Sequence, residues 1–585
     1  MPFDDLQQFV QHLEAGGQLK RVRAEVDPEL EVTEITQRVL REGGPALLFE
    51  NPKGSRTPLL MNLFGTTRRV NDALGGDPAQ IGAELFQAIQ RVNPPSLKGL
   101  WQSRSLIKRG LTTHPKKVGS AISQQVVEAP DLNRLPILKC WPGDGGRFIT
   151  YGMVLTQDPN TQRRNLGLYR LQVFGSGTTG MHWQSMKGGR GHYWHAEAAG
   201  KDLETAVIIG GDPILMIAAI LPLPEDVDEL AFAGFLRGRS IGLARAKTLD
   251  MLVPANAEFV FEGVVPKGVR KLEGPFGDHF GHYSEAAEFP VFQIRKVTHR
   301  RNPIYVATVV GKPPQEDKFL GIAAGQMVGP LIKLINPNIV DMCAYVGAGF
   351  HNLLVVSLAE RHPKENLKTA MSLLGTGQLS LTKVMVLVNR GVDPADFHAV
   401  LKEIRLRFDP EDHMWLLPFM PLDTLDFTSF KMHVGSKLII NAAGADGEEI
   451  RKRREPVQAI DPKPFDARIE AYRWLEGAFL VIVVKSNPRE VLANLVRAPL
   501  DVRFVIAVSG DVGLDDDENL QWGIFTRFDP ARDIIVTEQT FVGARPVYRG
   551  IVGIDATWKE GYPAPLAMDE SVVQLVDRRW GEYWK

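Results

Sequence analysis

The chain has few cysteines and no excess of charge. Its 585 residues include only two cysteines, Cys140 and Cys343, which are too few and too far apart for a disulfide framework or a thiolate metal site. The 68 basic and 69 acidic residues give a formal net charge of −1, so no overall field favours nucleic acid or an anionic membrane. These shortages indicate a protein of a reducing compartment that binds neither partner.

A long apolar segment is also missing. The most apolar stretch, Ala206–Pro224, is broken by Gly210–Pro213, and its uninterrupted part is shorter than the roughly 20 residues that a membrane-spanning helix needs. The amino-terminus reads Met-Pro-Phe-Asp-Asp, which is acidic where a signal peptide would be basic. We therefore expect no transmembrane segment and a cytoplasmic location.

The length and the pattern of apolar residues indicate a mixed α/β protein of several domains. Residues 1–110 combine a helical stripe with the short apolar run Ala46–Phe49, as in an α/β region. Residues 111–325 contain strands separated by turns, such as Phe148–Gln157 and its return strand Arg164–Phe174, which predict a small barrel or sandwich. Residues 326–560 alternate strands and helices in an α/β layer architecture, and 561–585 form a tail.

The region 326–560 contains an internal repeat. A strand at Val384–Val388, a loop, a helix and Arg407-Phe-Asp-Pro410 recur in the same order as Val505–Val508, a loop, a helix and Arg527-Phe-Asp-Pro530. The match in element order predicts a duplicated unit. The charged run Glu448–Pro456 between the copies is interpreted as a solvated linker.

A G-x-G-x-x-G motif at Gly175–Gly180 follows a strand, and Glu197 lies roughly 20 residues on, the spacing of a dinucleotide site. That fingerprint requires a helix to start at its last glycine, but Met-His-Trp-Gln follows Gly180. We favour a hairpin turn here, with a nicotinamide oxidoreductase as the alternative function.

Two pairs of histidines have the i, i+3 spacing of possible metal ligands. His192 and His195 could share a helical face, but the glutamate and third ligand of a zincin site are not evident. His279 and His282 enclose a glycine, which disfavours a helix. We do not favour zinc at either pair.

Two acids bracket a tight turn, Glu273-Gly-Pro-Phe-Gly-Asp278, and Arg170 lies on an earlier strand. The glycines and the proline can bring both carboxylates to one side, where their repulsion separates their pKa values. A nearby guanidinium could hold a substrate carboxylate through two hydrogen bonds. This set suits binding an acid and protonating a carbanion, but on chemistry alone an ordinary surface turn fits as well.

At these residues the chain resembles the UbiD family of reversible decarboxylases that depend on prenylated FMN. The similar segments follow the family's order through most of the chain: Arg147–Thr150, Arg164–Gln172, Thr179–Trp183, Glu229–Gly234, Val253-Pro254, Glu273–Asp278 and Gly553–Lys559. The resemblance implies an N-terminal α/β region, a central split β-barrel that binds the flavin, and a C-terminal α/β domain for homo-oligomerisation as a dimer or hexamer.

The resemblance also implies a metal that bridges the protein to the cofactor phosphate. Asn165 and Glu229 match the family's ligands for Mn²⁺ or Mg²⁺, which prefer oxygen, and K⁺ is a further candidate. Further positions match cofactor contacts: Leu168, Tyr169, Arg170, His182, Trp183, Gln184, Lys187 and Gly188, with Pro222 and Lys383 as weaker matches. Some members place a histidine ligand where this chain has Met186, and a thioether is a poor ligand for a hard cation. Water, His192 or His195 could complete the coordination, or two side chains suffice.

The resemblance gives Arg170, Glu273 and Asp278 the catalytic roles. Arg170 would orient the substrate carboxylate, Glu273 would tune the arginine and the acid, and Asp278 would deliver the proton. The implied reaction is reversible, non-oxidative loss of CO2 from an aromatic or α,β-unsaturated acid. Candidate substrates are 4-hydroxy-3-polyprenylbenzoate or a naphthoate of quinone biosynthesis, and a flavin prenyltransferase would supply the cofactor. A non-catalytic flavin-binding assembly protein is a further alternative.

Overall fold

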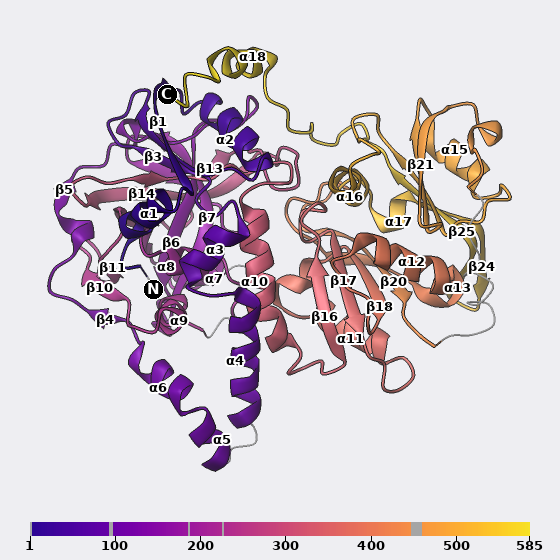
Figure 1. Ribbon diagram of the computed structural model, residues 1–585, viewed down its shortest axis with the longest axis horizontal. Coiled ribbons are helices and arrows are strands. Elements are labelled where there is room, and N and C mark those ends of the chain that lie inside the picture. The colour runs from indigo at the N-terminus through magenta and orange to yellow at the C-terminus, as the bar shows by residue number, and fades with distance from the viewer. Residues whose placement is uncertain (1–2, 93–96, 185–187, 225–226, 446–458) are drawn as a thin grey trace. The chain divides into compact units, whose positions relative to one another are not determined.

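The computed structural model describes residues 3–92, 97–184, 188–224, 227–445 and 459–585, which form two units (Figure 1). The first contains Met1–Asp278, His282–Val328 and Pro565–Lys585, and the second contains His279–Gly281 and Gly329–Ala564. The charged run at Glu448–Pro456 lies outside the described residues. Among the described helices, none has the length and apolar character needed to cross a membrane.

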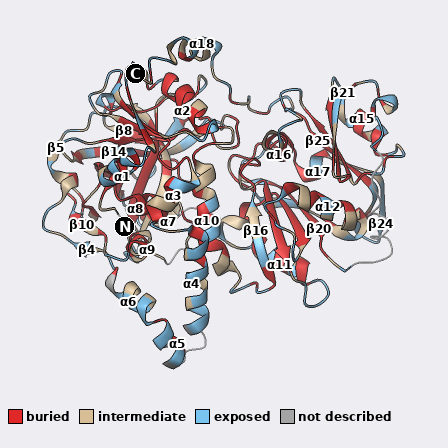
Figure 2. Ribbon diagram, in the orientation of Figure 1, coloured by how far each residue is buried: buried red, intermediate tan, exposed pale blue. Residues whose placement is uncertain are grey.

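The first unit begins with an α/β region. Helix α1 buries its predicted stripe of Leu6, Phe9, Val10 and Leu13, and a sheet with the order β1-β2-β3-β15 follows it. The elements of this region are α1 (Leu6–Ala15), β1 (Leu19–Val26), α2 (Glu31–Arg41), β2 (Ala46–Pro52), β3 (Leu59–Met61), α3 (Thr67–Leu74), α4 (Pro78–Val92), α5 (Leu97–Gln102), α6 (Arg104–Thr112) and β15 (Tyr305–Val306). In Figure 2 the strands are mostly buried, whereas α4, α5 and α6 are mostly exposed or intermediate.

A closed six-stranded barrel forms the centre of the first unit. Its strands are ordered β12-β9-β6-β7-β8-β14, and β14 pairs back onto β12. Their bounds are β6 (Phe148–Gln157), β7 (Arg164–Gly175), β8 (Thr178–Gly180), β9 (Leu203–Ile209), β12 (Phe259–Val265) and β14 (Ala287–His299), with β13 (Arg270–Glu273) and β5 (Val126–Glu128) paired outside the ring. The predicted barrel and its strands β6 and β7 are confirmed.

Further short elements complete the first unit: α7 (Gly188–Ala198), α8 (Pro213–Ala218), α9 (Glu229–Arg237), β4 (Lys116–Lys117), β10 (Gly242–Arg245), β11 (Leu252–Pro254) and α18 (Glu570–Arg579).

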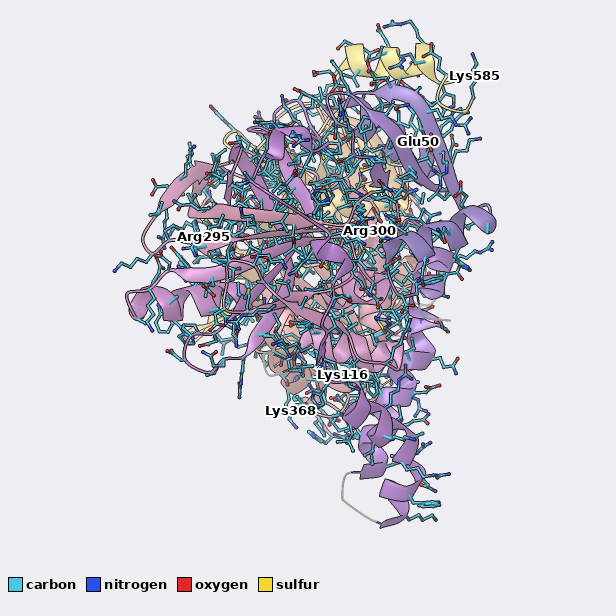
Figure 3. The ribbon with its side chains drawn as sticks, turned by 90° about the vertical axis from the view of Figure 1, so that its left-hand side faces the viewer. Glu50, Lys116, Arg295, Arg300, Lys368 and Lys585 are labelled. Atoms are coloured by element: carbon cyan, nitrogen blue, oxygen red, sulfur yellow. The ribbon has the colours of Figure 1, made fainter. Side chains whose placement is uncertain are left out.

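Arg300, labelled in Figure 3, follows β14 and connects the barrel with α1. Its Nη1 lies 3.0 Å from Glu258 Oε1 and 3.3 Å from Asp5 Oδ2. Burial of Glu258 raises the pKa of its carboxyl to about 7.

The second unit contains two five-stranded sheets of the same topology, and α10 (Asp317–Ile332) leads into it. The orders β16-β17-β18-β20-β19 and β21-β22-β23-β25-β24 correspond strand for strand, with the same parallel and antiparallel pairs. The predicted duplication is confirmed and is larger than the predicted strand–helix unit, because each copy also contains a preceding antiparallel pair of strands, a helix after that pair, and a closing antiparallel pair.

The first copy contains β16 (Ile339–Ala344), β17 (Leu353–Leu358), α11 (Glu365–Leu374), β18 (Val384–Asn389), α12 (Phe397–Arg407), α13 (Pro410–His413), β19 (Met414–Pro421) and β20 (Val434–Ala442). The second contains β21 (Ile469–Leu475), β22 (Phe479–Val484), α15 (Pro488–Leu495), β23 (Phe504–Val508), α16 (Asp517–Phe525), α17 (Pro530–Asp533), β24 (Ile534–Val542) and β25 (Arg545–Ala556). In each repeated Arg-Phe-Asp-Pro segment the aspartate caps the short helix that its proline begins.

Candidate active site

The arginine and the two acids predicted from the sequence lie together in the first unit. Arg170 projects from β7, Glu273 ends β13, and Asp278 follows the Gly-Pro-Phe-Gly turn. Arg170 Nε lies 3.3 Å from Glu273 Oε1, and Arg170 Nη1 forms an ion pair with Asp278 Oδ2. The side chains are 8%, 0% and 12% exposed in that order, so the three charges interact away from bulk water.

A buried aspartate holds the turn that separates the two acids. Asp144 Oδ1 accepts the Gly277 amide at 2.7 Å, and its Oδ2 accepts the amides of Cys140 at 3.0 Å and Trp141 at 2.9 Å. Burial raises the pKa of Asp144 to about 6, although the three amides favour its charged form. Asp144 therefore fixes the backbone one residue before Asp278.

His182 adds a fourth polar side chain to this group. Its Nδ1 lies 2.9 Å from Glu273 Oε1, the same oxygen that faces Arg170 Nε. Burial lowers the pKa of His182, and the positive charge of Arg170 lowers it further. A neutral imidazole that donates from Nδ1 would hold Glu273 in place. It would add no positive charge that competes with Arg170 for the Glu273 carboxylate.

The two predicted metal ligands lie close together near the start of β7. Glu229 begins α9, and its Oε2 accepts the amide of Leu166, the residue after Asn165, at 3.0 Å. Burial raises the pKa of Glu229 to about 7. Gly188 leaves the room that the Asn165 amide occupies, because a Cβ there would lie 2.2 Å from Asn165 Oδ1. The structure thus places the Glu229 carboxylate against the backbone next to Asn165, and both side chains offer the oxygen that a hard cation prefers.

Several buried polar atoms of these residues have no hydrogen-bond partner in the described structure. They are Asn165 Nδ2, His182 Nε2, Trp183 Nε1 and Glu273 Oε2. Burying such atoms without partners costs free energy, so in native proteins they normally meet a partner. The acceptor atoms of a flavin and its phosphate would supply partners for the N–H groups, and the oxygens of Asn165 and Glu229 remain for a cation, so the residues present fit a flavin and a metal.

The remaining predicted cofactor contacts are distributed unevenly. Tyr169 is buried on β7 beside Leu168, and burial raises the pKa of its hydroxyl to about 12. Gln184 is half-buried and Pro222 is exposed after α8, while Lys187 and the departure at Met186 lie outside the described residues. Lys383 belongs to the second unit, where its buried Nζ lies 2.8 Å from Asp426 Oδ2.

The alternative dinucleotide site does not have its required helix. Residues Gly175 and Thr178 pair in the β7–β8 hairpin, and 178–180 form a strand rather than a helix start, so the hairpin prediction is confirmed.

His192 and His195 lie on α7 as their spacing allowed, but each contacts a separate partner. His192 Nδ1 lies 2.9 Å from Thr156 Oγ1, and His195 Nδ1 lies 2.8 Å from Asp158 Oδ2.

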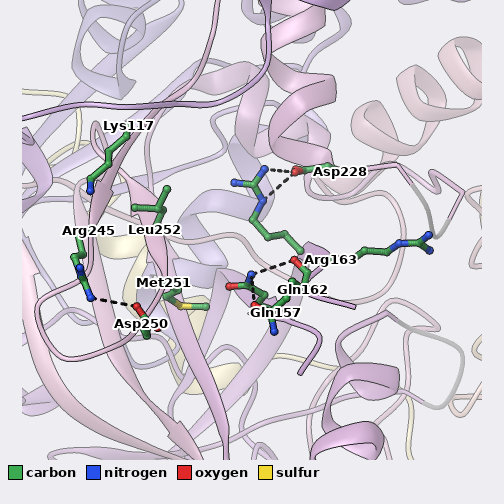
Figure 4. Close-up of a pocket in the computed structure, with 10 residues that line it drawn as sticks. Lys117, Gln157, Gln162, Arg163, Asp228, Arg245, Asp250, Met251 and Leu252 are labelled. Atoms are coloured by element: carbon green, nitrogen blue, oxygen red, sulfur yellow. Dashed lines mark hydrogen bonds and ion pairs between the residues drawn. The ribbon is translucent and has the colours of Figure 1, made fainter. Parts of the chain in front are cut away.

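A cavity of about 540 Å³ lies at the connection between β6 and β7 (Figure 4). It is lined by Lys117, Gln157, Gln162, Arg163, Arg164, Asp228, Arg245, Asp250, Met251 and Leu252. Arg164 and Asp228 form an ion pair there, and they immediately precede Asn165 and Glu229 in the sequence. The residues that line this cavity are therefore neighbours in sequence of Asn165 and Glu229, and none of Arg170, Glu273 and Asp278 lines it.

Three family models together match most of the chain. They describe the N-terminal, Rift-related and C-terminal domains of 3-octaprenyl-4-hydroxybenzoate carboxy-lyase, the UbiD family, and they match residues 10–89, 116–313, and 318–442 with 472–556. The chain belongs to the UbiD family.

Relatives of known name and structure agree with UbiD membership. A Chlamydia pneumoniae protein named as a component of 4-hydroxybenzoate decarboxylase is 36% identical over 99% of this chain and 98% of its own length. The vanillic acid decarboxylase of Sedimentibacter hydroxybenzoicus has a TM-score of 0.68 and 27% identity, covering 79% of this chain and 96% of its own. HmfF from Pelotomaculum thermopropionicum, a UbiD-class enzyme solved with FMN, has a TM-score of 0.62 and 26% identity, covering 79% and 98%.

Sequence reasoning missed four side chains of the UbiD site. Arg170 Nη2 donates to Ser284 Oγ at 3.1 Å, and the guanidinium lies 4.7 Å from the centre of the Phe276 ring. Gln172 holds the start of the turn by accepting the Gly274 amide at 2.8 Å, as Asp144 holds its end. Gln172 and Phe276 stood inside the segments that carried the resemblance, but only the folded contacts show what they do.

Proposed function

We propose that the chain is a decarboxylase of an aromatic or α,β-unsaturated carboxylic acid and that it depends on prenylated FMN. The observation that carries the proposal is the buried guanidinium of Arg170 between the carboxylates of Glu273 and Asp278. A substrate carboxylate has its natural partner in this guanidinium, and a proton donor stands beside it. Family membership supports the same reaction class.

Asn165 and Glu229 would hold a divalent cation, Mn²⁺ or Mg²⁺, against the cofactor phosphate, with K⁺ as a further candidate. Trp183 and His182, whose Nε1 and Nε2 have no partner among the described residues, would contact the flavin. When bound, prenylated FMN supplies the electron sink that amino-acid side chains lack for the charge left as CO2 departs. HmfF has also been solved in an evolved form with prenylated FMN, at 25% identity to this chain and a TM-score of 0.62.

The side chains of this chain would act in order. Arg170 exchanges its contact with Asp278 for the incoming substrate carboxylate, and Glu273 with His182 keeps the guanidinium oriented. Asp278, released from Arg170, then carries the proton that the reaction needs. After CO2 leaves, Asp278 delivers that proton to the carbon that carried the carboxylate.

The substrate class follows from the relatives. Their names give 4-hydroxybenzoate and vanillic acid, both phenolic acids, which agrees with an aromatic acid for this chain. A quinone-pathway benzoate or naphthoate remains our candidate for the physiological substrate, with a flavin prenyltransferase as the source of the cofactor. The duplicated second unit is proposed to serve homo-oligomerisation.

The proposal is tested with full-length protein co-expressed with a flavin prenyltransferase. The bound flavin is identified by mass and absorption spectrum, and phenolic, naphthoic and cinnamic acids are screened for CO2 release. We expect prenylated FMN at one per chain and turnover of at least one acid. Loaded protein that binds these acids without exchanging CO2 would instead support a non-catalytic flavin-binding protein, and NAD(H)-dependent turnover would support the oxidoreductase alternative.

A further inference from the structure

Three potential metal ligands from distant parts of the sequence converge in the second unit. One ligand atom of each of His279, His351 and Asp423 lies within 4.8 Å of the ligand atoms of the other two. Among the described residues, no other group of three or more histidine, cysteine and acidic side chains meets this condition. The cluster is separate from Asn165 and Glu229, which belong to the first unit.

The topology of the first repeat explains why two of these side chains meet. His351 lies just before β17, and Asp423 lies between β19 and β20. Strands β17, β18 and β20 are parallel, so both positions fall at the edge where these strands begin. The backbone at this edge is held by the Lys383 amide, which donates to the His351 carbonyl at 2.8 Å.

The carboxylate of the cluster is held in a ligand-like orientation. Asp423 Oδ1 accepts the Leu425 amide at 2.9 Å, while Oδ2 lies 2.7 Å from His351 Nδ1. Its side chain is only 2% exposed, so the carboxylate is held away from bulk water. Carboxylates that bind metals are usually held in place by hydrogen bonds of this kind, here from the Leu425 amide.

His279 approaches from the segment that follows Asp278, within a shell of aromatic rings. Its ring centre lies 5.0 Å from that of Phe280, 6.2 Å from that of Phe350 and 6.4 Å from that of His351. The rings of Phe280 and Phe350 therefore border the cluster on the side of His279.

We propose that His279, His351 and Asp423 form a binding site for a divalent transition-metal cation, with zinc as the best fit. Two imidazoles and one carboxylate are the ligand types that zinc prefers, and they leave a further position for water. Bonds of about 2.0–2.1 Å in tetrahedral geometry place ligand atoms about 3.4 Å apart, which small side-chain rotations reach from the observed separations. The site differs from the oxygen-only cofactor site in its ligands and in the metal that it selects.

Cobalt distinguishes this site from the cofactor metal. Full-length protein is stripped with a chelator and titrated with Co²⁺ in an Asn165→Ala and Glu229→Ala background. A site with two imidazoles and low coordination number absorbs strongly in the visible range, whereas a six-coordinate oxygen site absorbs weakly. We expect one equivalent of strongly absorbing Co²⁺, displaced by Zn²⁺.

His351→Gln keeps a hydrogen-bonding group near Asp423 and removes one imidazole, and it should weaken Co²⁺ binding at least about 100-fold. His279→Ala should have the same effect. His362→Ala is the matched control, because His362 is 57% exposed and lies outside the cluster while still facing a carboxylate, that of Glu365 at 3.6 Å. The absence of the strong band, or its persistence in both cluster variants, would overturn the site.

Discussion

Gly188→Ala should remove the cofactor metal without unfolding the protein. A Cβ at Gly188 would lie 2.2 Å from Asn165 Oδ1 and 3.0 Å from its Cγ, so the amide must move by about 1 Å to reach a normal contact. Metal ligands tolerate about ±0.2 Å. Changes in the surroundings of a ligand already cost about 10–100-fold in metal affinity, so we expect at least a tenfold loss.

Gly191→Ala is the matched control for this prediction. Gly191 lies on the same helix, α7, and its added Cβ would have no neighbour within 4 Å. Gly191→Ala lies inside the helix and should favour it by about 0.5–1 kcal/mol, whereas Gly188 begins the helix and does not share this gain. The thermal midpoint of each variant is measured to check that the protein stays folded. Metal content by mass spectrometry and flavin per chain are measured in parallel. Normal metal and flavin in Gly188→Ala, or an equal loss in Gly191→Ala, would refute the assignment of Asn165.

Three further changes test other parts of the account. Asp144→Asn turns one acceptor oxygen into a donor that faces a backbone amide, so kcat should fall about 100-fold at unchanged flavin content. The control is Asp131→Asn, at a side chain that accepts an exposed backbone amide, and it should leave kcat unchanged. Arg170→Lys loses the fork that grips a carboxylate, so KM for the acid should rise at least about tenfold; an unchanged KM would contradict its role. Glu258→Gln tests the raised pKa of Glu258, about 7 in the native state against 4.5 in the unfolded chain. Because the native state binds the extra proton, the stability of the wild type relative to the variant should fall by up to about 3 kcal/mol as the pH rises from 4.5 to 7. A difference between their unfolding midpoints that stays constant over this pH range would contradict it.

Much of the fold could be predicted from local pattern. The bounds of β6 match the apolar run Phe148–Gln157, and the hairpin at Gly175–Thr178 followed from poor helix-start residues after Gly180. The closure of the barrel could not be predicted in this way, because the pairing of β12 with β14 depends on register over a long separation. The repeat was visible because identical residues cap identical short helices, at Asp409 and Asp529.

The site shows the same division between local and distant information. The turn from Glu273 to Asp278 stood out because glycine and proline mark such turns, but its supports Asp144 and Gln172 are ordinary polar residues that become informative only through their contacts. The cluster around His279 was missed for a related reason. Spacing suggested His282 as its companion, whereas the fold supplies His351 and Asp423 from distant loops.

The central claim is that Asp278 delivers the proton to the carbon that loses CO2. Solvent-deuterium incorporation into an accepted aromatic acid's product, measured on flavin-loaded wild type and Asp278→Asn, tests it most directly. The account predicts one deuterium per turnover at the former carboxylate carbon in the wild type, and a rate at least about 1,000-fold lower in the variant with the same flavin content. Unchanged turnover and deuterium incorporation in Asp278→Asn would contradict it.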